Sequence, residues 1–101
     1  MKLYVRPAFY QDIAHEELWL LEHAGATVAD RWHAALGDTI VFLRKNPLMG
    51  RVRTDLKFPG IRSWRVQEFG RWIVFYGVRD DTLILYRVVS GAMNLLALRF
   101  D

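Results

Sequence analysis

The stretch IRSWRVQEFGRWIVFYGVRDDTLILYRVV, residues 61–89, decides the fold of this chain. It contains three strand-like runs, residues 61–69, 72–78 and 82–89, which are rich in β-branched and aromatic side chains. A lone Gly70 separates the first two runs, and a short polar turn separates the last two. Runs of this composition between short turn signals predict an antiparallel β-meander.

Three arginines lie inside these strands, namely Arg62, Arg65 and Arg87. An arginine is costly to bury without a partner, so each side chain must meet water, a carboxylate or an anionic ligand. Glu68, Asp80 or the carboxylates of a bound protein are candidate partners, and a phosphate is the alternative. The identity of these partners is the functional question that the sequence poses.

The composition is that of a single packed domain, which we expect to span residues 1–101. Apolar residues make up 52% of the chain, against 25% charged, which disfavours disorder and allows an apolar surface for a partner. The net charge is +3, and the arginines concentrate between Arg44 and Arg87. The planar guanidinium group suits recognition of carboxylates or phosphates.

The absence of some residue patterns narrows the possible functions. The chain has no Cys, which excludes disulfides, thiolate metal sites and cysteine nucleophiles. His15, His23 and His33 are too widely spaced for a zinc site, so we predict solvated or cap-like histidines, no metal and no cofactor. The apolar runs are shorter than the roughly 20 residues of a membrane span, and the N-terminus lacks a signal-peptide core. We therefore expect a cytoplasmic protein without membrane contact.

The first half of the chain predicts a strand followed by two helices. Residues 2–6 alternate polar and apolar side chains as a short strand does, and Pro7 suits the first turn of a helix. Residues 8–24 carry an apolar helical stripe, and a second helix is expected to begin with a capping-box-like Thr27 and to end at Asn46. The predicted stripes are Tyr10, Ile13, Ala14, Leu18 and Leu21, then Ala29, Trp32, Leu36, Ile40 and Leu43.

The order of these elements predicts the fold class. A loop over residues 47–60, with a short strand near residues 53–56, leads into the meander, and residues 90–101 form an apolar tail. We expect an α+β fold in which an N-terminal strand and a helical hairpin precede the antiparallel β-meander. The two helices are expected to pack on one face of the sheet.

Several short motifs occur along nearly the whole chain in a fixed order. They are Ala8 with Asp12-Ile13, Leu43-x-x-Asn46-Pro47-x-x-Gly50-Arg51, Pro59-Gly60-Ile61-Arg62, Ile73-Val74-Phe75-Tyr76 and Arg87-Val88-Val89. Together they resemble the ParE/RelE superfamily of toxins from bacterial type II toxin–antitoxin systems, and its ParE side more closely. The tail over residues 91–98 is similar to the ending of that family.

The resemblance implies a function. A ParE-like toxin inhibits DNA gyrase by binding it, arrests growth, stabilises plasmids and is neutralised by a cognate antitoxin in a hetero-oligomer. DNA would be contacted only through the antitoxin. Two alternatives stay open: a RelE-like mRNA interferase that cleaves message on the ribosome, and a non-toxic relative that only binds the antitoxin.

Ribonuclease chemistry would need cations for the phosphorane and side chains that transfer protons. Arg62 and Arg87 match the sheet arginines of the superfamily and, with Arg65, are the candidate catalytic residues of that alternative. Family members usually carry a histidine and an arginine–aspartate pair after the last strand. At those positions this chain has Ser90, Met93 and Asn94. The sequence thus favours a protein-binding toxin over an endoribonuclease.

The surplus of aromatic residues predicts an antitoxin-binding surface, because a domain of this size cannot bury all of them. Leu18, Trp19, Trp64 and Trp72 are the residues that we expect to contact the antitoxin. The alternative for two of them is a cross-strand pair, since Trp64 and Trp72 flank the expected turn at Gly70.

Overall fold

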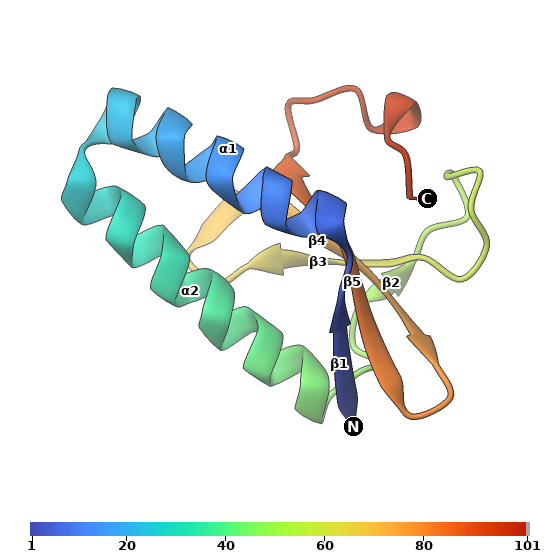
Figure 1. Cartoon of the computed structure of the whole chain (residues 1–101). Helices are drawn as coiled ribbons and strands as arrows, with labels where there is room; N and C mark the ends of the chain where they lie inside the picture. Colours follow the sequence, from blue (N-terminus) through green and yellow to red (C-terminus); the bar gives the residue numbers. More distant parts are fainter. Residues whose placement is uncertain (101) are drawn as a thin grey trace.

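The predicted meander is the centre of a five-stranded sheet in the computed structural model, which describes residues 1–100 (Figure 1). The elements are β1 (Lys2–Val5), α1 (Pro7–Ala24), α2 (Ala26–Lys45), β2 (Arg51–Val52), β3 (Arg62–Val66), β4 (Phe69–Arg79), β5 (Thr82–Ser90) and the 3-10 turn η1 (Leu95–Ala97). The strand order is β1-β5-β4-β3-β2, with β1 parallel to β5 and the other neighbours antiparallel. Both helices cover one face of the sheet, so the predicted α+β fold is confirmed (Figure 1).

Two tight turns connect the strands of the meander. The β3–β4 turn is Gln67-Glu68, where Glu68 has φ 66°, and the β4–β5 turn contains Asp80, which has φ 55°. These left-handed conformations reverse the chain over two residues. Gly70 lies within β4, so the prediction of a turn at Gly70 is wrong.

The helix α2 buries the stripe that its sequence predicts. Ala29, Trp32, Leu36 and Leu43 are buried, and Ile40 packs against them half-buried. The helix begins at Ala26, directly after Gly25 with φ 90°, and no side chain caps its first turn. The predicted cap at Thr27 is therefore wrong, whereas the predicted end before Pro47 is confirmed.

The helix α1 is rotated about its axis relative to the prediction. Tyr10, Leu18 and Leu21 are exposed, and the buried residues are Phe9, Asp12, Glu16 and Leu20. The sheet explains the difference, because Trp72 and Arg87 present hydrogen-bond donors to Glu16 and Asp12 of α1. Neither helix among residues 1–100 is long and apolar enough to span a membrane.

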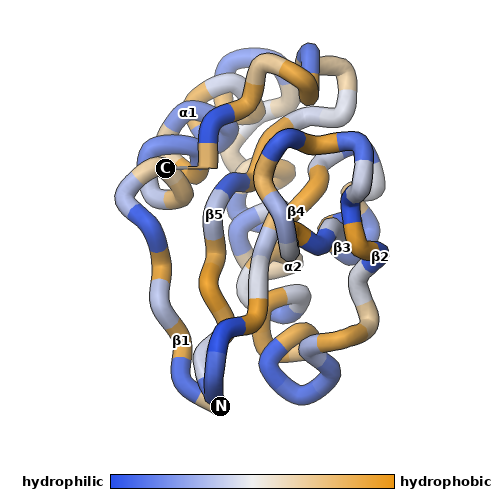
Figure 2. Tube along the Cα trace, turned by 90° about the vertical axis from the view of Figure 1, so that its right-hand side faces the viewer, coloured by the Kyte–Doolittle hydropathy of each residue, from blue (hydrophilic) through white to orange (hydrophobic). Residues whose placement is uncertain are grey.

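Apolar clusters form on both faces of the sheet, and Figure 2 shows the apolar residues along its central strands. The larger cluster lies between the helices and the sheet and contains the fully buried Trp32 and Tyr76. On the other face, the segment after β5 packs Leu98 and Phe100 against Phe75. The end of the predicted apolar tail is thus part of the core, whereas Met93 and Leu96 are exposed.

The loop between α2 and β3 differs from its prediction. Its strand is β2 at Arg51–Val52, earlier than the predicted residues 53–56. The next residue, Arg53, is buried and donates two hydrogen bonds to the carboxylate of Asp55, at 2.9 and 2.6 Å. Arg53 Nη1 also donates to Ser63 Oγ at 3.3 Å. Residues 53–55 therefore form a local ion pair rather than a strand.

Candidate binding surfaces and arginine sites

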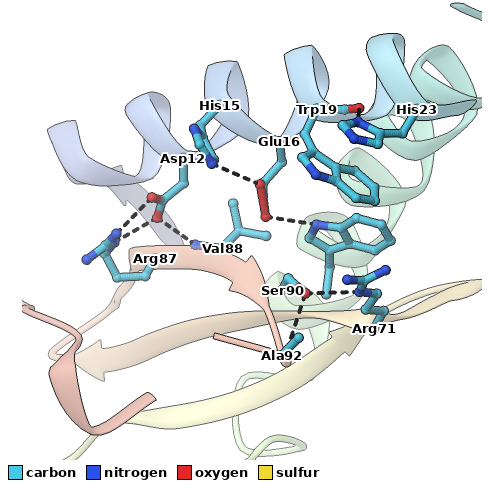
Figure 3. A network of polar contacts seen from close by, with 11 residues as sticks. Asp12, His15, Glu16, Trp19, His23, Arg71, Arg87, Val88, Ser90 and Ala92 are labelled. Atoms are coloured by element: carbon cyan, nitrogen blue, oxygen red, sulfur yellow. Dashed lines mark hydrogen bonds and ion pairs between the residues drawn. The ribbon is translucent and has the colours of Figure 1, made fainter. Parts of the chain in front are cut away.

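Arg87 forms a bidentate ion pair with Asp12 of α1 (Figure 3). Its Nε donates to Asp12 Oδ2 at 2.7 Å and its Nη2 donates to Asp12 Oδ1 at 2.9 Å. The remaining nitrogen, Nη1, donates to the carbonyl oxygen of Arg99 at 3.2 Å. The hydrogen bond to Asp12 raises the pKa of Arg87. Each nitrogen of the guanidinium group has an internal acceptor and little of the side chain is exposed, so Arg87 is a poor candidate for binding a phosphate.

The edge of the sheet explains why Asp12 lies there. β1 pairs with β5 only as far as Leu85, so in the described part of the chain the outer side of the next residues of β5, away from β4, has no strand beside it. A bulge places Phe75 opposite Arg87 although Tyr76 is opposite Leu85, and bulges redirect side chains at such points. Asp12 Oδ2 accepts from the backbone N–H of Val88 at 3.0 Å. The carboxylate thus replaces the missing strand.

One turn further along α1, Glu16 performs the same task for the indole of Trp72. Trp72 Nε1 donates to Glu16 Oε1 at 3.0 Å, and both residues are buried. The other carboxylate oxygen lies 3.8 Å from Nε2 of the exposed His15. Asp12 and Glu16 are therefore polar core residues that dock α1 onto the sheet.

Arg71 covers the aromatic residues next to this contact. Its guanidinium carbon lies 5.2 Å from the ring centroid of Trp19 and 5.8 Å from that of Trp72. Its Nε donates to Ser90 Oγ at 3.1 Å, and His23 stacks on Trp19 with ring centroids 4.3 Å apart (Figure 3). A small pocket of about 200 Å³ lies among these residues and α1. The three histidines are exposed, as predicted.

Arg62 binds the backbone of the loop that follows α2. Its Nη1 donates to the carbonyl oxygens of Leu48 at 3.2 Å and of Gly50 at 2.8 Å. The hydroxyl of Tyr76 accepts from Gly50 N and donates to Pro47 O, both at 2.8 Å, and burial raises the pKa of this tyrosine. A Cβ at Gly50 would collide with the Tyr76 hydroxyl. Arg62 and Tyr76 therefore hold residues 47–50 in place.

Arg65 is the exposed member of the three candidate catalytic residues. Its Nη1 donates to the carbonyl oxygen of Gly70 across the β3–β4 turn. Arg62, Arg65 and Arg87 thus bind three separate sets of internal acceptors, and the structure does not bring them together around one anion site. The carboxylates that we considered as partners, Glu68 and Asp80, are not used, since Asp12 pairs with Arg87 instead.

A groove of about 750 Å³ runs along the edge of β3. β2 pairs with β3 only at Arg62 and Ser63, so among residues 1–100 no strand lies on the outer side of the following residues of β3. We call this surface the β3-edge groove and define it by the apolar Phe42, Met49 and Trp64 and the basic Arg51, Arg53 and Arg65. Its mixed lining suits a peptide with both apolar and acidic side chains.

A second groove, of about 780 Å³, lies between the outer sides of α1 and α2. We call it the hairpin groove and define it by Ala14, Leu18, Leu21, Ala29 and Ala34. Leu18 and Leu21 are 56% and 50% exposed, because α1 turns Asp12 and Glu16 toward the sheet and these leucines toward solvent. An exposed apolar pair of this kind is typical of a protein-binding surface.

The four predicted antitoxin contacts fall at different places. Leu18 lies in the hairpin groove, Trp64 lies half-buried in the β3-edge groove, and Trp19 is half-buried under Arg71. Trp72 is only 6% exposed and packs edge-on against Trp19 and Trp32, so it offers little surface to a partner. The cross-strand alternative is also wrong, since the register places Val74 opposite Trp64.

Sequence reasoning missed two groups of residues in these sites. Phe42 stacks on Trp64 at 5.6 Å and forms the wall of the β3-edge groove, although it lies outside the predicted stripe of α2. Asp12 and Glu16 are buried although both are acidic. Their spacing of four residues, together with unpaired donors in the strands, was the available signal, because it places two carboxylates on one helical face.

Comparisons with known proteins agree with this architecture. The family model described as the ParE toxin of the type II toxin–antitoxin system parDE matches residues 3–95. The chain is 32% identical over 76 residues to Toxin ParE3 of Caulobacter vibrioides, covering 75% of this chain and 72% of that protein.

Two solved structures share the fold. A chain from the chromosomal ParDE TA system of P. aeruginosa has a TM-score of 0.75 at 14% identity, covering 89% of this chain and 95% of that chain. The conserved hypothetical protein HP0894 from Helicobacter pylori has a TM-score of 0.55 at 24% identity, covering 91% of this chain and 96% of that chain.

Proposed function

Because this chain belongs to the ParE toxin family of type II toxin–antitoxin systems, we propose that it arrests growth by binding DNA gyrase and that a cognate antitoxin neutralises it. The toxin acts as a protein-binding inhibitor rather than an enzyme. It works in the cytoplasm, where gyrase acts, and it meets DNA only through the antitoxin. Arrest of cells that lose the antitoxin would stabilise a plasmid that carries the pair.

The hydrogen bonds of the sheet arginines are the observation that favours a protein-binding mechanism over a nuclease. A nuclease that stabilises a phosphorane needs cations free to meet the phosphate. Arg87 is held by Asp12 and the Arg99 carbonyl, and the Nη1 of Arg62 is held by two loop carbonyls. At the end of β5, Ser90 Oγ accepts from Arg71 Nε, and in the segment that follows, Asn94 Oδ1 accepts from Leu96 N at 3.2 Å. These polar groups serve the fold, which supports a protein-binding role.

The two grooves support an antitoxin partner. We propose that Leu18, Trp19 and Trp64 contact the antitoxin, while Trp72 supports Trp19 from below. Leu18 and Trp64 line grooves of about 780 and 750 Å³, and clefts with exposed apolar anchors are the places where flexible partner segments bind. Ordering such a segment over the domain buries these anchors on complex formation.

A supercoiling assay with purified gyrase tests the proposed target. Excess toxin is expected to abolish the introduction of supercoils, and toxin premixed with its antitoxin is expected to have no effect. Full supercoiling at excess toxin would remove gyrase as the target. Primer extension on ribosome-bound message examines the RelE-like alternative, in which new cleavage sites would appear. Expression without the antitoxin is expected to arrest growth; harmless expression would identify a non-toxic antitoxin-binding relative.

A further inference from the structure

From the open edge of the sheet, and resting on the proposed function, we infer that the β3-edge groove binds an extended segment of the antitoxin as an additional strand beside β3. The segment alternates apolar and acidic side chains. Three features of the groove carry this inference: free backbone groups at Arg65, different linings on the two faces of β3, and a surplus of positive charge.

The hydrogen-bond pattern identifies the free backbone groups. Arg53 N donates to Ile61 O at 2.8 Å, and Ser63 lies opposite Arg51. Residues bonded to the same neighbouring strand recur every second position in an antiparallel ladder, so Arg65 directs its N–H and C=O to the same side as Ile61 and Ser63. β2 does not extend to Arg65.

The stretch of β3 with free backbone groups is short, which fixes the position of the added antitoxin strand, called the guest strand below. The next N–H on this side belongs to Gln67 and donates to Thr39 Oγ1 of α2 at 3.0 Å. The hydroxyl of Thr39 therefore closes the edge on one side of Arg65, and β2 closes it on the other. A peptide strand would bond to the backbone of Arg65, as in other cases of β-strand addition.

The two faces beside this edge differ in chemistry. On the helix side, Trp64 stacks on Phe42 with ring centroids 5.6 Å apart and an interplanar angle of 22°. On the opposite side, Arg51 and Arg65 lie on the same face as Ser63, because side chains alternate along each strand and Arg51 pairs with Ser63. A guest strand therefore directs alternate side chains to an apolar surface and to two exposed arginines.

The positive charge of the β3-edge groove favours an acidic occupant. Arg53 already pairs with Asp55, but Arg51 and Arg65 are exposed and the chain carries a net charge of +3. A second copy of this chain would bring its own β3 arginines to the same edge, and like charges opposite each other destabilise a strand pair. An acidic segment satisfies both arginines, so the antitoxin fits the edge better than a second copy does.

Amide hydrogen exchange of the full chain, measured by NMR alone and with the antitoxin encoded beside its gene, tests this directly. We expect the Arg65 amide to exchange rapidly in the free toxin and about 100-fold more slowly in the complex. The Trp64 amide faces β4 and is expected to be protected in both states. A complex in which the Arg65 amide still exchanges rapidly overturns strand addition and leaves the proposed function intact. Failure of the two proteins to associate overturns both.

Matched charge reversals test the acidic side chains. Arg51→Glu is expected to weaken antitoxin affinity about tenfold, because it places a carboxylate beside the acidic segment. Arg79→Glu changes the net charge equally but lies at the exposed end of β4, next to the β4–β5 turn, and is expected to leave the affinity nearly unchanged. Equal weakening by the two variants would show only general electrostatic attraction and would overturn recognition at the groove.

Discussion

The sheet has two incompletely paired edges, and the chain treats them in opposite ways. Beyond β1, the edge of β5 is closed by Asp12, which binds the Val88 N–H and the guanidinium group of Arg87. Beyond β2, the edge of β3 is left as a groove with exposed arginines. An edge that finds its acceptors within the domain is structural, whereas an edge whose donors remain free is suited to a partner. The comparison therefore separates stability from recognition.

The largest expected effect is a loss of stability when the residue that closes the β5 edge is removed. Asp12→Ala leaves the Arg87 side chain, only 17% exposed, without its carboxylate and leaves the Val88 N–H without an acceptor. We expect unfolding in urea to show a loss of about 3 kcal/mol, the low end for a broken buried ion pair. Asp38→Ala, at an exposed position of α2, is the control and should stay within about 0.5 kcal/mol of the parent. Similar losses for the two variants would show that the β5 edge is not closed by this pair.

The next-largest effect concerns the open edge of β3 and should appear in the affinity for the antitoxin. Trp64→Ala removes the aromatic anchor that stacks on Phe42, and we expect about 2 kcal/mol weaker antitoxin binding, or about 30-fold in Kd. Isothermal titration calorimetry measures this change, with circular dichroism to confirm folding. Tyr4→Ala on the exposed side of β1 is the control and should bind normally. Unchanged affinity of the Trp64 variant would place the antitoxin elsewhere.

A smaller effect comes from the loop that supports the open edge. Tyr76→Phe removes the hydroxyl that binds Gly50 N and Pro47 O, and thereby loosens the loop that carries Met49 into the groove. Loss of these buried hydrogen bonds should cost about 1 to 2 kcal/mol of unfolding free energy. Tyr86→Phe, at a half-buried position of β5, is the matched control. If the two phenylalanine variants were equally stable, the Tyr76 hydroxyl would not hold the loop.

The smallest effect concerns the ion pair of Arg53 and Asp55 beside the open edge and depends on pH. The hydrogen bond from Arg53 lowers the pKa of Asp55 from 3.8 to about 2, so the stabilisation by this carboxylate is complete above its unfolded pKa and is lost as the pH falls through the folded value. The stability difference between the parent and Asp55→Asn should therefore be constant above roughly pH 5 and shrink toward pH 2. Urea unfolding at several pH values measures it. A difference that does not change with pH would mean that the charge of Asp55 contributes nothing.

Much of the architecture follows from local patterns. The meander and the buried stripe of α2 are predictable because strand composition and helical spacing of apolar residues are local properties of the sequence. The structure forms the predicted strands and buries the apolar stripe of α2. The buried face of α1 is not predictable in this way. Its leucines Leu18 and Leu21 are exposed, whereas the carboxylates of Asp12 and Glu16 are buried. Hydrophobicity alone does not reveal that Trp72 and Arg87 require acceptors.

The sequence by itself determined the family, the α+β fold and the abundance of arginines and aromatic residues available for recognition. Only the tertiary structure decided which of these side chains are free. Arg87 and Trp72 are used internally because α1, which lies 56 to 75 residues earlier in the chain, brings Asp12 and Glu16 within hydrogen-bonding distance. Arg51, Arg65 and Trp64 remain accessible because β2 ends after two residues. Such outcomes depend on contacts between distant segments, and a local pattern does not encode them.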